Sequence, residues 1–190
     1  MARTKEFDEE QALDAAIGVF AEHGYEGSST GALLEAMGIG RQSLYDTFGD
    51  KRQLFLAALQ RYNQRSVAQI IAALDAAASP LAGVESALVA FAQRSGQGKA
   101  CLGTHSVCEF GDGDAEVTAL NVASGRVLRE ALERRLREAQ AAGELAADLP
   151  LRHAAQFLSA LLSGLRIAAR GGSSVQTLRQ IARTAVRGLR

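Results

Sequence analysis

The chain has 190 residues, of which 47% are hydrophobic and 22% are charged, and its 21 basic side chains balance its 21 acidic ones. This much apolar surface argues against intrinsic disorder and for a globular protein. The two cysteines are too few for a disulfide framework. The N-terminal residues lack the apolar stretch of a signal peptide, and no apolar run is long enough to span a bilayer. We therefore expect a cytoplasmic protein that does not interact with membranes.

Helical periodicity dominates the chain from its start. Aromatic residues make up only 5%, runs of β-branched residues are absent, and apolar residues recur at spacings of three and four. The first apolar stripe predicts a helix over residues 9–23, with Asp8 and Gln11 at capping-box spacing and Gly24 at its end. The fold class that follows is all-α.

Two short helices joined by a tight glycine turn are predicted next. Three consecutive hydroxyl residues are available to cap the first helix: Ser28, Ser29 and Thr30. Residues 38–40 read Gly-Ile-Gly, and residues 41–48 allow about two helical turns before the next glycine. Four side chains are left on the outer face of the second helix: Arg41, Gln42, Ser43 and Tyr45. This arrangement is typical of a helix-turn-helix.

Six further helical segments follow, beginning near residues 51, 80, 99, 114, 150 and 175, which gives about nine helices in all. The segment over residues 150–170 is apolar on most sides, and the last helix has an apolar face beside arginines at four-residue spacing. These two helices could form a four-helix bundle with those of a second copy. The predicted dimer interface consists of Phe157, Leu158, Leu161, Leu162, Leu165, Leu178, Ile181 and Ala185.

Two motifs lie within the first sixty residues. Residues 16–25 read AIGVFAEHGY, and residues 44–51 read LYDTFGDK after the glycine turn. On these motifs, residues 9–59 resemble the N-terminal domain of the TetR family of transcriptional repressors. The rest of the chain is similar to that family only in length, helix number and a closing helix pair. Many members have Ser or Thr where this chain has Gly40, so its third helix lacks a hydroxyl cap.

The resemblance implies a DNA-binding helix-turn-helix domain over residues 1–50 and a ligand-binding and dimerisation domain over residues 51–190. It also implies a homodimer whose third helices enter successive major grooves of a palindromic operator in double-stranded DNA. Arg41 can read guanine and Gln42 adenine. Phosphate, thymine or minor-groove contacts are expected for Ser28, Ser29, Thr30, Ser43, Tyr45, Lys51, Arg3 and Lys5.

Charge is unevenly distributed, and this bears on the DNA-binding interpretation. Residues 1–52 carry five basic and ten acidic side chains, a balance of 5 − 10 = −5, whereas residues 53–190 carry 16 basic and 11 acidic ones, or +5. DNA binding therefore depends on where a few cations lie, not on net charge. We expect modest nonspecific affinity and a shallow dependence of affinity on salt.

The region expected to bind a ligand gives weaker signals. Cys101, His105 and Cys108 are spaced to share one helix face, so they could form a thiol or metal sensor, or they could be plain core and pocket residues. A small apolar or amphipathic effector is expected between the helices. The candidate pocket residues are Tyr62, Phe91, Cys101, His105, Cys108, Phe110 and Phe157.

Together these observations predict a ligand-responsive repressor, with no cofactor, no bound metal and no catalytic residues. One alternative is a helical interaction or scaffold module that does not recognise an operator. A thiol-dependent enzyme is a further alternative, although no oxyanion hole accompanies the cysteine and histidine.

Overall fold

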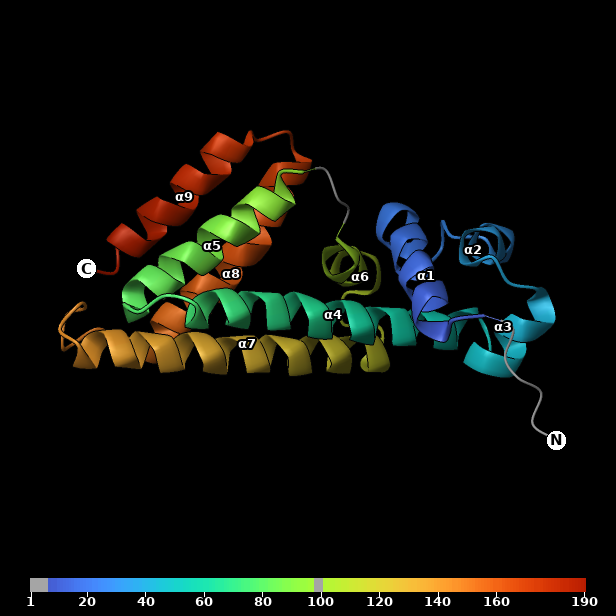
Figure 1. Ribbon diagram of the computed structural model, residues 1–190, viewed down its shortest axis with the longest axis horizontal. Helices are drawn as coiled ribbons and strands as arrows, with labels where there is room; N and C mark the ends of the chain where they lie inside the picture. Colours follow the sequence, from blue (N-terminus) through green and yellow to red (C-terminus); the bar gives the residue numbers. More distant parts are fainter. Residues whose placement is uncertain (1–6, 98–100) are drawn as a thin grey trace. The chain divides into compact units, whose positions relative to one another are not determined.

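The computed structural model describes residues 7–97 and 101–190, and these residues form nine α-helices and no strand (Figure 1). This confirms the predicted all-α fold. The helices are α1 (Glu9–His23), α2 (Thr30–Met37), α3 (Arg41–Phe48), α4 (Lys51–Asp75), α5 (Pro80–Ser95), α6 (Leu102–Phe110), α7 (Ala115–Ala141), α8 (Leu151–Arg170) and α9 (Val175–Arg187). None of the described helices is long and apolar enough to cross a membrane.

The helix ends follow the capping chemistry of the sequence. The Asp8 carboxylate accepts hydrogen bonds from the backbone N–H groups of Glu10 and Gln11 at the start of α1, at 2.9 and 3.1 Å. Gly38 ends α2 in the left-handed conformation with φ of 65°, which favours glycine. The residue before α3 is Gly40, and no side chain caps that helix. The glycine turn is therefore formed as predicted, with an uncapped third helix.

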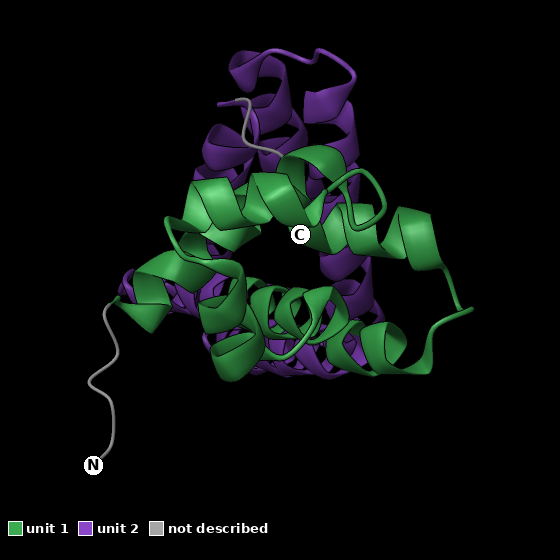
Figure 2. Cartoon of the chain, turned by 90° about the vertical axis from the view of Figure 1, so that its right-hand side faces the viewer, with its two compact units in different colours: residues 1–63, 100–121 green, residues 64–99, 122–190 purple. Residues whose placement is uncertain are grey.

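The chain divides into two compact units (Figure 2). Unit 1 comprises residues 1–63 and 100–121, and unit 2 comprises residues 64–99 and 122–190. Unit 1 thus contains α6 and the start of α7 together with the three N-terminal helices, so the units divide the chain elsewhere than after residue 50. The functional division into residues 1–50 and 51–190 stays a prediction.

The core of unit 1 is built around aromatic rings. Phe20 and Phe55 are fully buried, and their ring centroids lie 5.1 Å apart in an edge-to-face arrangement. The ring centroid of Tyr25, just after α1, lies 5.1 Å from that of Phe55 and 5.6 Å from that of Phe110. Helices α1, α4 and α6 therefore contribute to one aromatic cluster. Leu44 of α3 is 1% exposed and belongs to the same core. The short third helix is thereby held by its single fully buried side chain.

Unit 2 packs α5 against α8 and α9, with the later turns of α4 and α7 completing its core. The amphipathic helix α9 buries Leu178, Ala182 and Val186. Gly96, just after α5, permits close packing, because a Cβ there would lie 2.6 Å from a methyl carbon of Val175.

Burial corrects part of the predicted dimer interface. Four of its leucines lie inside the chain's own core, each 3% exposed or less: Leu158, Leu162, Leu165 and Leu178. Leu158, Leu162 and Leu165 were assigned to an interface because apolar residues lie on several sides of α8, and Leu178 because it lies on the apolar face of α9; neither pattern shows whether that face packs in the chain's own core. Phe157 and Ile181 remain 48% and 37% exposed, and Leu161 and Ala185 are half-buried.

Candidate nucleic-acid interface

The outer face of α3 presents polar side chains on a helix that the core holds in place. Arg41 and Gln42 are exposed, Tyr45 is 49% exposed and Ser43 is half-buried. The helix begins directly at the glycine turn, and its inward residue Leu44 fixes which face points outward. The structure thus brings these four predicted residues onto one short helix with polar atoms available to a ligand.

Asp46 orients the amide of Gln42, a contact that the sequence interpretation missed. The Gln42 Nε2 atom donates to Asp46 Oδ1 at 2.8 Å. The i,i+4 spacing of the two residues on α3 was the available signal. This bond uses one of the two N–H groups of the Gln42 amide. The second N–H and the amide oxygen stay available, and together they can pair with an adenine edge.

The start of α2 assigns different roles to the three predicted hydroxyl residues. Ser29 is the exposed N-cap and accepts from the backbone N–H of Ala32 at 3.1 Å, and Thr30 is the first helical residue. Ser28 is fully buried, and its hydroxyl donates to the carbonyl of Gly24. Ser28 therefore cannot meet a phosphate in this structure, because its donor is already used inside the fold.

Lys51 begins α4 beside an aromatic ring. Its ammonium nitrogen lies 4.4 Å from the ring centroid of Tyr25, and Asp50 caps the same helix by accepting from the backbone N–H of Gln53 at 2.8 Å. The carboxylate of Asp50 already satisfies one of the donors that were expected to bind phosphate. Arg3 and Lys5, the predicted N-terminal arm, lie outside the described residues.

A carboxylate on α6 holds the turn between α1 and α2. Glu109 accepts from the backbone N–H of Tyr25 at 2.8 Å and from that of Glu26 at 2.7 Å. The segment that leads into α2 is therefore tied to α6 by two charge-assisted hydrogen bonds. No sequence pattern could indicate this contact, because its partners are more than eighty positions apart.

Two arginines of α4 neutralise carboxylates within unit 1. The Arg52 guanidinium contacts Asp114 at 2.7 Å and Glu116 at 3.1 Å, and its hydrogen bond lowers the pKa of the Asp114 carboxyl below its ordinary range. Arg61 contacts Asp14 of α1 at 2.7 Å. Arg61, which lies outside residues 1–52, thus offsets part of the acidic excess near the N-terminus, whereas Arg52 is already counted among the basic side chains there.

The predicted cysteine and histidine face is not formed as expected. Cys101 is buried and Cys108 is exposed. Cys101 precedes α6 as its N-cap, and its sulfur accepts from the Thr104 backbone N–H at 3.3 Å and from the Tyr62 hydroxyl at 3.2 Å. Cys101 therefore precedes the helix that carries Cys108, and the two cysteines differ in burial. The described residues contain no cluster of three or more histidine, cysteine or acidic side chains suited to a metal ion.

The remaining predicted pocket residues are distributed over both units. Tyr62, His105 and Phe110 belong to unit 1, where Phe110 is part of the aromatic cluster described above. Phe91 and Phe157 belong to unit 2, where Phe91 is 5% exposed and Phe157 is largely exposed on α8. Phe110 thus packs in the core of unit 1. That these residues line a ligand pocket stays a prediction.

Two family models match the chain. One, described as bacterial regulatory proteins of the tetR family, matches residues 12–58, and the other, a tetracyclin repressor-like C-terminal domain, matches residues 77–185. The HTH-type transcriptional repressor ComR of Escherichia coli (strain K12) is 33% identical over 190 residues, covering 97% of this chain and 90% of ComR. The HTH-type transcriptional regulator YezE of Bacillus subtilis (strain 168) is 51% identical over 79 residues, covering 42% of this chain and 41% of YezE.

Solved structures with the same architecture include complexes with DNA. One is a cysteine mutant of the TetR family transcriptional regulator CifR complexed with 26 bp double-strand operator DNA. It is 32% identical to this chain with a TM-score of 0.84, and the match covers 99% of this chain and 100% of that one. The similarity therefore extends over nearly the whole length of a regulator bound to its operator.

Proposed function

The chain belongs to the TetR family of bacterial regulatory proteins, and on this premise we propose that it is a ligand-responsive repressor that binds a palindromic operator as a homodimer. The observation that carries the proposal is the outer face of α3, where Arg41, Gln42 and Tyr45 are exposed on a helix held by Leu44. A surface of this kind reads base edges in the major groove.

Direct readout is assigned to two residues of α3. Arg41 can donate two hydrogen bonds to guanine O6 and N7. Gln42, with its amide oriented by Asp46, can donate to N7 and accept from N6 of adenine. Ser43 and Tyr45 position the helix on the phosphates, together with Ser29 and Thr30 at the start of α2 and Lys51 at the start of α4.

A second copy of the chain is the proposed occupant of the outer face of α8. Phe157 and Ile167 are 48% and 59% exposed on that face, and the small residues Ala160 and Gly164 between them are also exposed. Ile181 of α9 is 37% exposed. Large apolar side chains separated by small ones allow two helices to pack closely, and a two-fold axis would use the same face of both copies.

The ligand would act by changing how the two helix-turn-helix domains of the dimer, its DNA-binding heads, are placed. An effector lowers operator affinity only if it binds more tightly to the conformation in which the heads do not fit the operator. This function needs no catalytic step, and both the matching family model and the relative ComR are described as regulators.

Fluorescence anisotropy with labelled DNA from immediately upstream of the chain's own reading frame tests the proposal. We expect saturable binding that unlabelled specific DNA displaces and scrambled DNA does not, with two chains per site by light scattering. A matched control is Arg126→Ala, which removes one exposed cation from α7, far in sequence from α3. Failure to find any preferred sequence by selection from random duplexes would refute operator recognition and favour a scaffold.

The salt dependence of binding gives a separate check. Each phosphate contact adds about −0.9 to the slope of log affinity against log salt concentration. Because few cations lie near α3, we expect a shallow slope. A slope that requires about ten or more phosphate contacts per dimer would contradict the proposed interface.

A further inference from the structure

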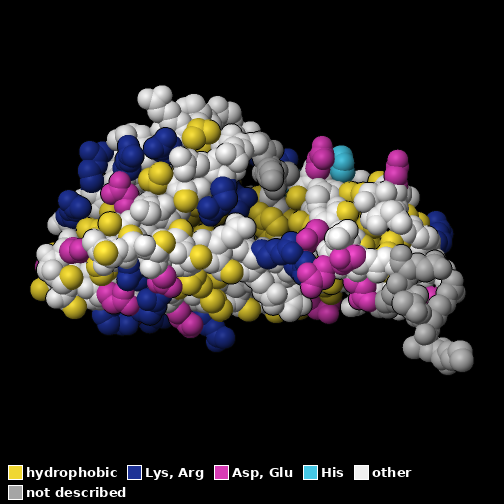
Figure 3. Space-filling view, viewed as in Figure 1, with side chains coloured by type: hydrophobic (Ala, Val, Ile, Leu, Met, Phe, Trp, Pro, Cys, Tyr) yellow, Lys and Arg dark blue, Asp and Glu magenta, His cyan; other side chains and the backbone are white. Residues whose placement is uncertain are grey.

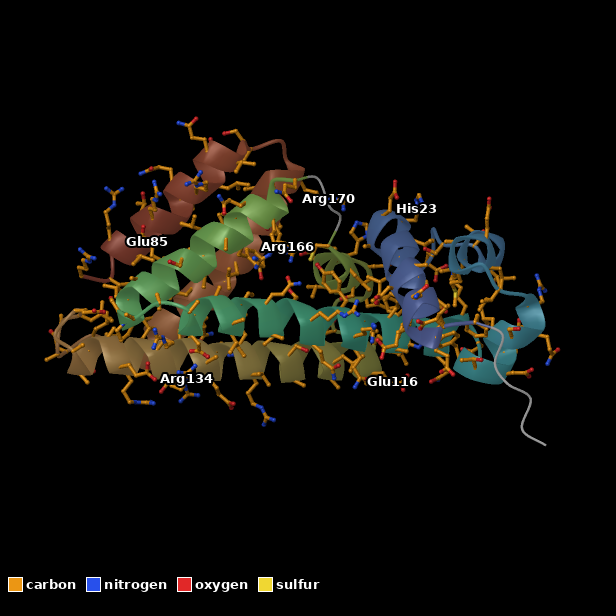
Figure 4. All side chains as sticks on the ribbon, in the orientation of Figure 1. His23, Glu85, Glu116, Arg134, Arg166 and Arg170 are labelled. Atoms are coloured by element: carbon orange, nitrogen blue, oxygen red, sulfur yellow. The ribbon has the colours of Figure 1, made fainter. Side chains whose placement is uncertain are left out.

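An acidic side chain lies on the outer face of α3, the face proposed to meet DNA. Asp46 is exposed and lies one turn after the exposed Gln42 on that helix. Arg41 and Tyr45, also exposed and one turn apart, form the neighbouring row of the same face. Side chains that end in oxygen or nitrogen extend outward from α3 in Figure 4. A carboxylate on this face needs a physical reason, because it lies where the negative phosphates of DNA would approach.

Two effects oppose a carboxylate at this position. Asp46 lies in the last turn of α3, where the partial negative charge of the helix C-terminus repels it. Its charge also repels DNA phosphates, and few cations offset it, since Arg41 is the only Lys or Arg in α1, α2 and α3. Figure 3 shows more Lys and Arg side chains over α5 and α9 than over these three helices. Asp46 therefore disfavours both the helix and nonspecific DNA binding unless a contact compensates.

The compensating contact is the hydrogen bond with Gln42. The Gln42 Nε2 atom donates to Asp46 Oδ1 at 2.8 Å, and the Asp46 carboxylate has no other hydrogen bond or ion pair among the described residues. A carboxylate only accepts hydrogen bonds, so only the NH2 end of the Gln42 amide can meet it. The amide oxygen is thereby held at the other end, away from Asp46. Without this bond, the amide could exchange its oxygen and nitrogen by turning about its last side-chain bond.

An amide held in one orientation distinguishes the two purines. In the major groove adenine presents the acceptor N7 beside the donor N6 amino group, whereas guanine presents two acceptors, N7 and O6. The second N–H and the oxygen of the Gln42 amide match the adenine pair. Against guanine, the same orientation places the amide oxygen opposite O6, and two acceptors repel each other. An amide that is free to turn would offer its NH2 group to guanine and lose this discrimination.

We propose that Asp46 is a positioning residue that sets the base preference of Gln42, so that the chain selects adenine over guanine at one position of each half-site. Asp46 does not contact a base itself. The inference rests on the proposed function, because it states which base one residue of the reading helix selects and what makes that residue selective. The unfavourable effects of the carboxylate on the helix and on nonspecific binding are then offset by sequence specificity.

Base preferences of the full chain test this role. Selection from duplexes with a random core, followed by sequencing, gives the preference at every position, and Gln42→Ala identifies the position that Gln42 reads. We expect the unsubstituted chain to prefer adenine over guanine there by about tenfold or more, as for a well-placed bidentate contact. Asp46→Asn should lower this ratio to about threefold or less, because the asparagine amide can hold the Gln42 amide in either orientation. Glu35→Gln should keep the ratio; it is the matched control, since the exposed Glu35 carboxylate on α2 forms no hydrogen bond or ion pair among the described residues.

Two further readouts separate a positioning role from a merely structural one. The thermal midpoint of Asp46→Asn should stay within about 2 °C of the unsubstituted chain, because the side chain is exposed and its i,i+4 bond contributes little to helix stability. Its affinity for scrambled DNA, measured by fluorescence anisotropy at low salt, should rise about twofold or more, since a charge that repels phosphates is gone. A larger fall in the midpoint together with weaker binding to scrambled DNA would overturn the role, because Asp46 would then be structural.

The selection also separates failure of this inference from failure of the proposed function. An unchanged adenine preference in Asp46→Asn would overturn the role of Asp46 and leave operator recognition intact. Loss of a cytosine preference at another position would overturn it as well, because Asp46 would then accept directly from a cytosine amino group. Absence of any preferred sequence for the unsubstituted chain would refute operator recognition and the role of Asp46 together.

Discussion

The two hydrogen bonds of Glu109 give a prediction about how α6 supports the DNA-binding helices. Replacing Glu109 by glutamine keeps the size of the side chain but removes its charge, and it leaves one carbonyl oxygen where two oxygens accepted. The backbone N–H groups of Tyr25 and Glu26, at 2.8 and 2.7 Å from the carboxylate, can then no longer both be satisfied by that side chain. The turn between α1 and α2 should become easier to open.

The expected magnitude follows from the exposure of this contact. A hydrogen bond to a charged group contributes about 1.5–3 kcal/mol when it is shielded from water. Glu109 is exposed, so water can replace part of each bond, and we expect Glu109→Gln to lower the free energy of unfolding by about 1–2 kcal/mol in total. For a chain of this size that corresponds to a fall in the thermal midpoint of about 2–8 °C.

Urea unfolding, followed by circular dichroism and fluorescence anisotropy with operator DNA, measures both consequences. The matched control is Glu130→Gln, because the Glu130 carboxylate is exposed and lies 3.9 Å from Arg126 in a single i,i+4 pair. If ordering the turn on DNA costs the variant about 1 kcal/mol in each chain, the cost for the dimer is about 2 kcal/mol, and operator affinity should fall about thirtyfold. A Glu109→Gln variant as stable as the control would refute the account of the turn.

Three further predictions concern other contacts of unit 1. The hydrogen bond with Arg52 lowers the pKa of Asp114 below its ordinary value of 3.8, so on acidification the Asp114 carboxyl is protonated at a higher pH in the unfolded chain than in the folded one. The contribution of this contact to the free energy of unfolding should therefore be complete above about pH 5 and decrease as the pH falls. Urea unfolding at a series of pH values should show a smaller decrease in Asp114→Asn. A thiol-specific reagent should modify the exposed Cys108 well before the buried Cys101, and equal rates measured by mass spectrometry would contradict the assigned burial. Gly38→Ala should destabilise the chain to urea by about 1–2 kcal/mol because φ is positive there, and an unchanged midpoint would show that the turn relaxes.

Local features of the fold were predictable because their determinants are close together in the sequence. Helices α1 and α3 have the bounds that the apolar spacing and the flanking glycines indicated. The cap at Asp8 and the left-handed turn at Gly38 depend on contacts within three or four residues, so a reader of the sequence can recognise them. The outward face of α3 was also predictable, because Leu44 has to point into the core.

Features that depend on distant residues were not predictable in the same way. The burial of Leu158 depends on which helices cover α8, and the exposed Phe157 and Ile167 add apolar residues outside the buried face of this amphipathic helix. The role of Glu109 was missed because its partners, the backbone N–H groups of Tyr25 and Glu26, lie more than eighty positions away in the turn between α1 and α2. Ser28 was given a phosphate role by its neighbours in sequence, although its hydroxyl turns inward to bond the main chain. Each of these errors arose where a tertiary contact overrides local preference.

Operator binding by the double variant Arg41→Ala, Gln42→Ala tests the central claim most directly. Even at about 1 kcal/mol for each base contact in both half-sites, the loss of specific affinity should reach about 1,000-fold. The dimer and its thermal midpoint should be unchanged, because both side chains are exposed. Specific affinity that falls to the level of scrambled DNA would bear out α3 as the reading helix, and specific affinity equal to that of the unsubstituted chain would contradict it.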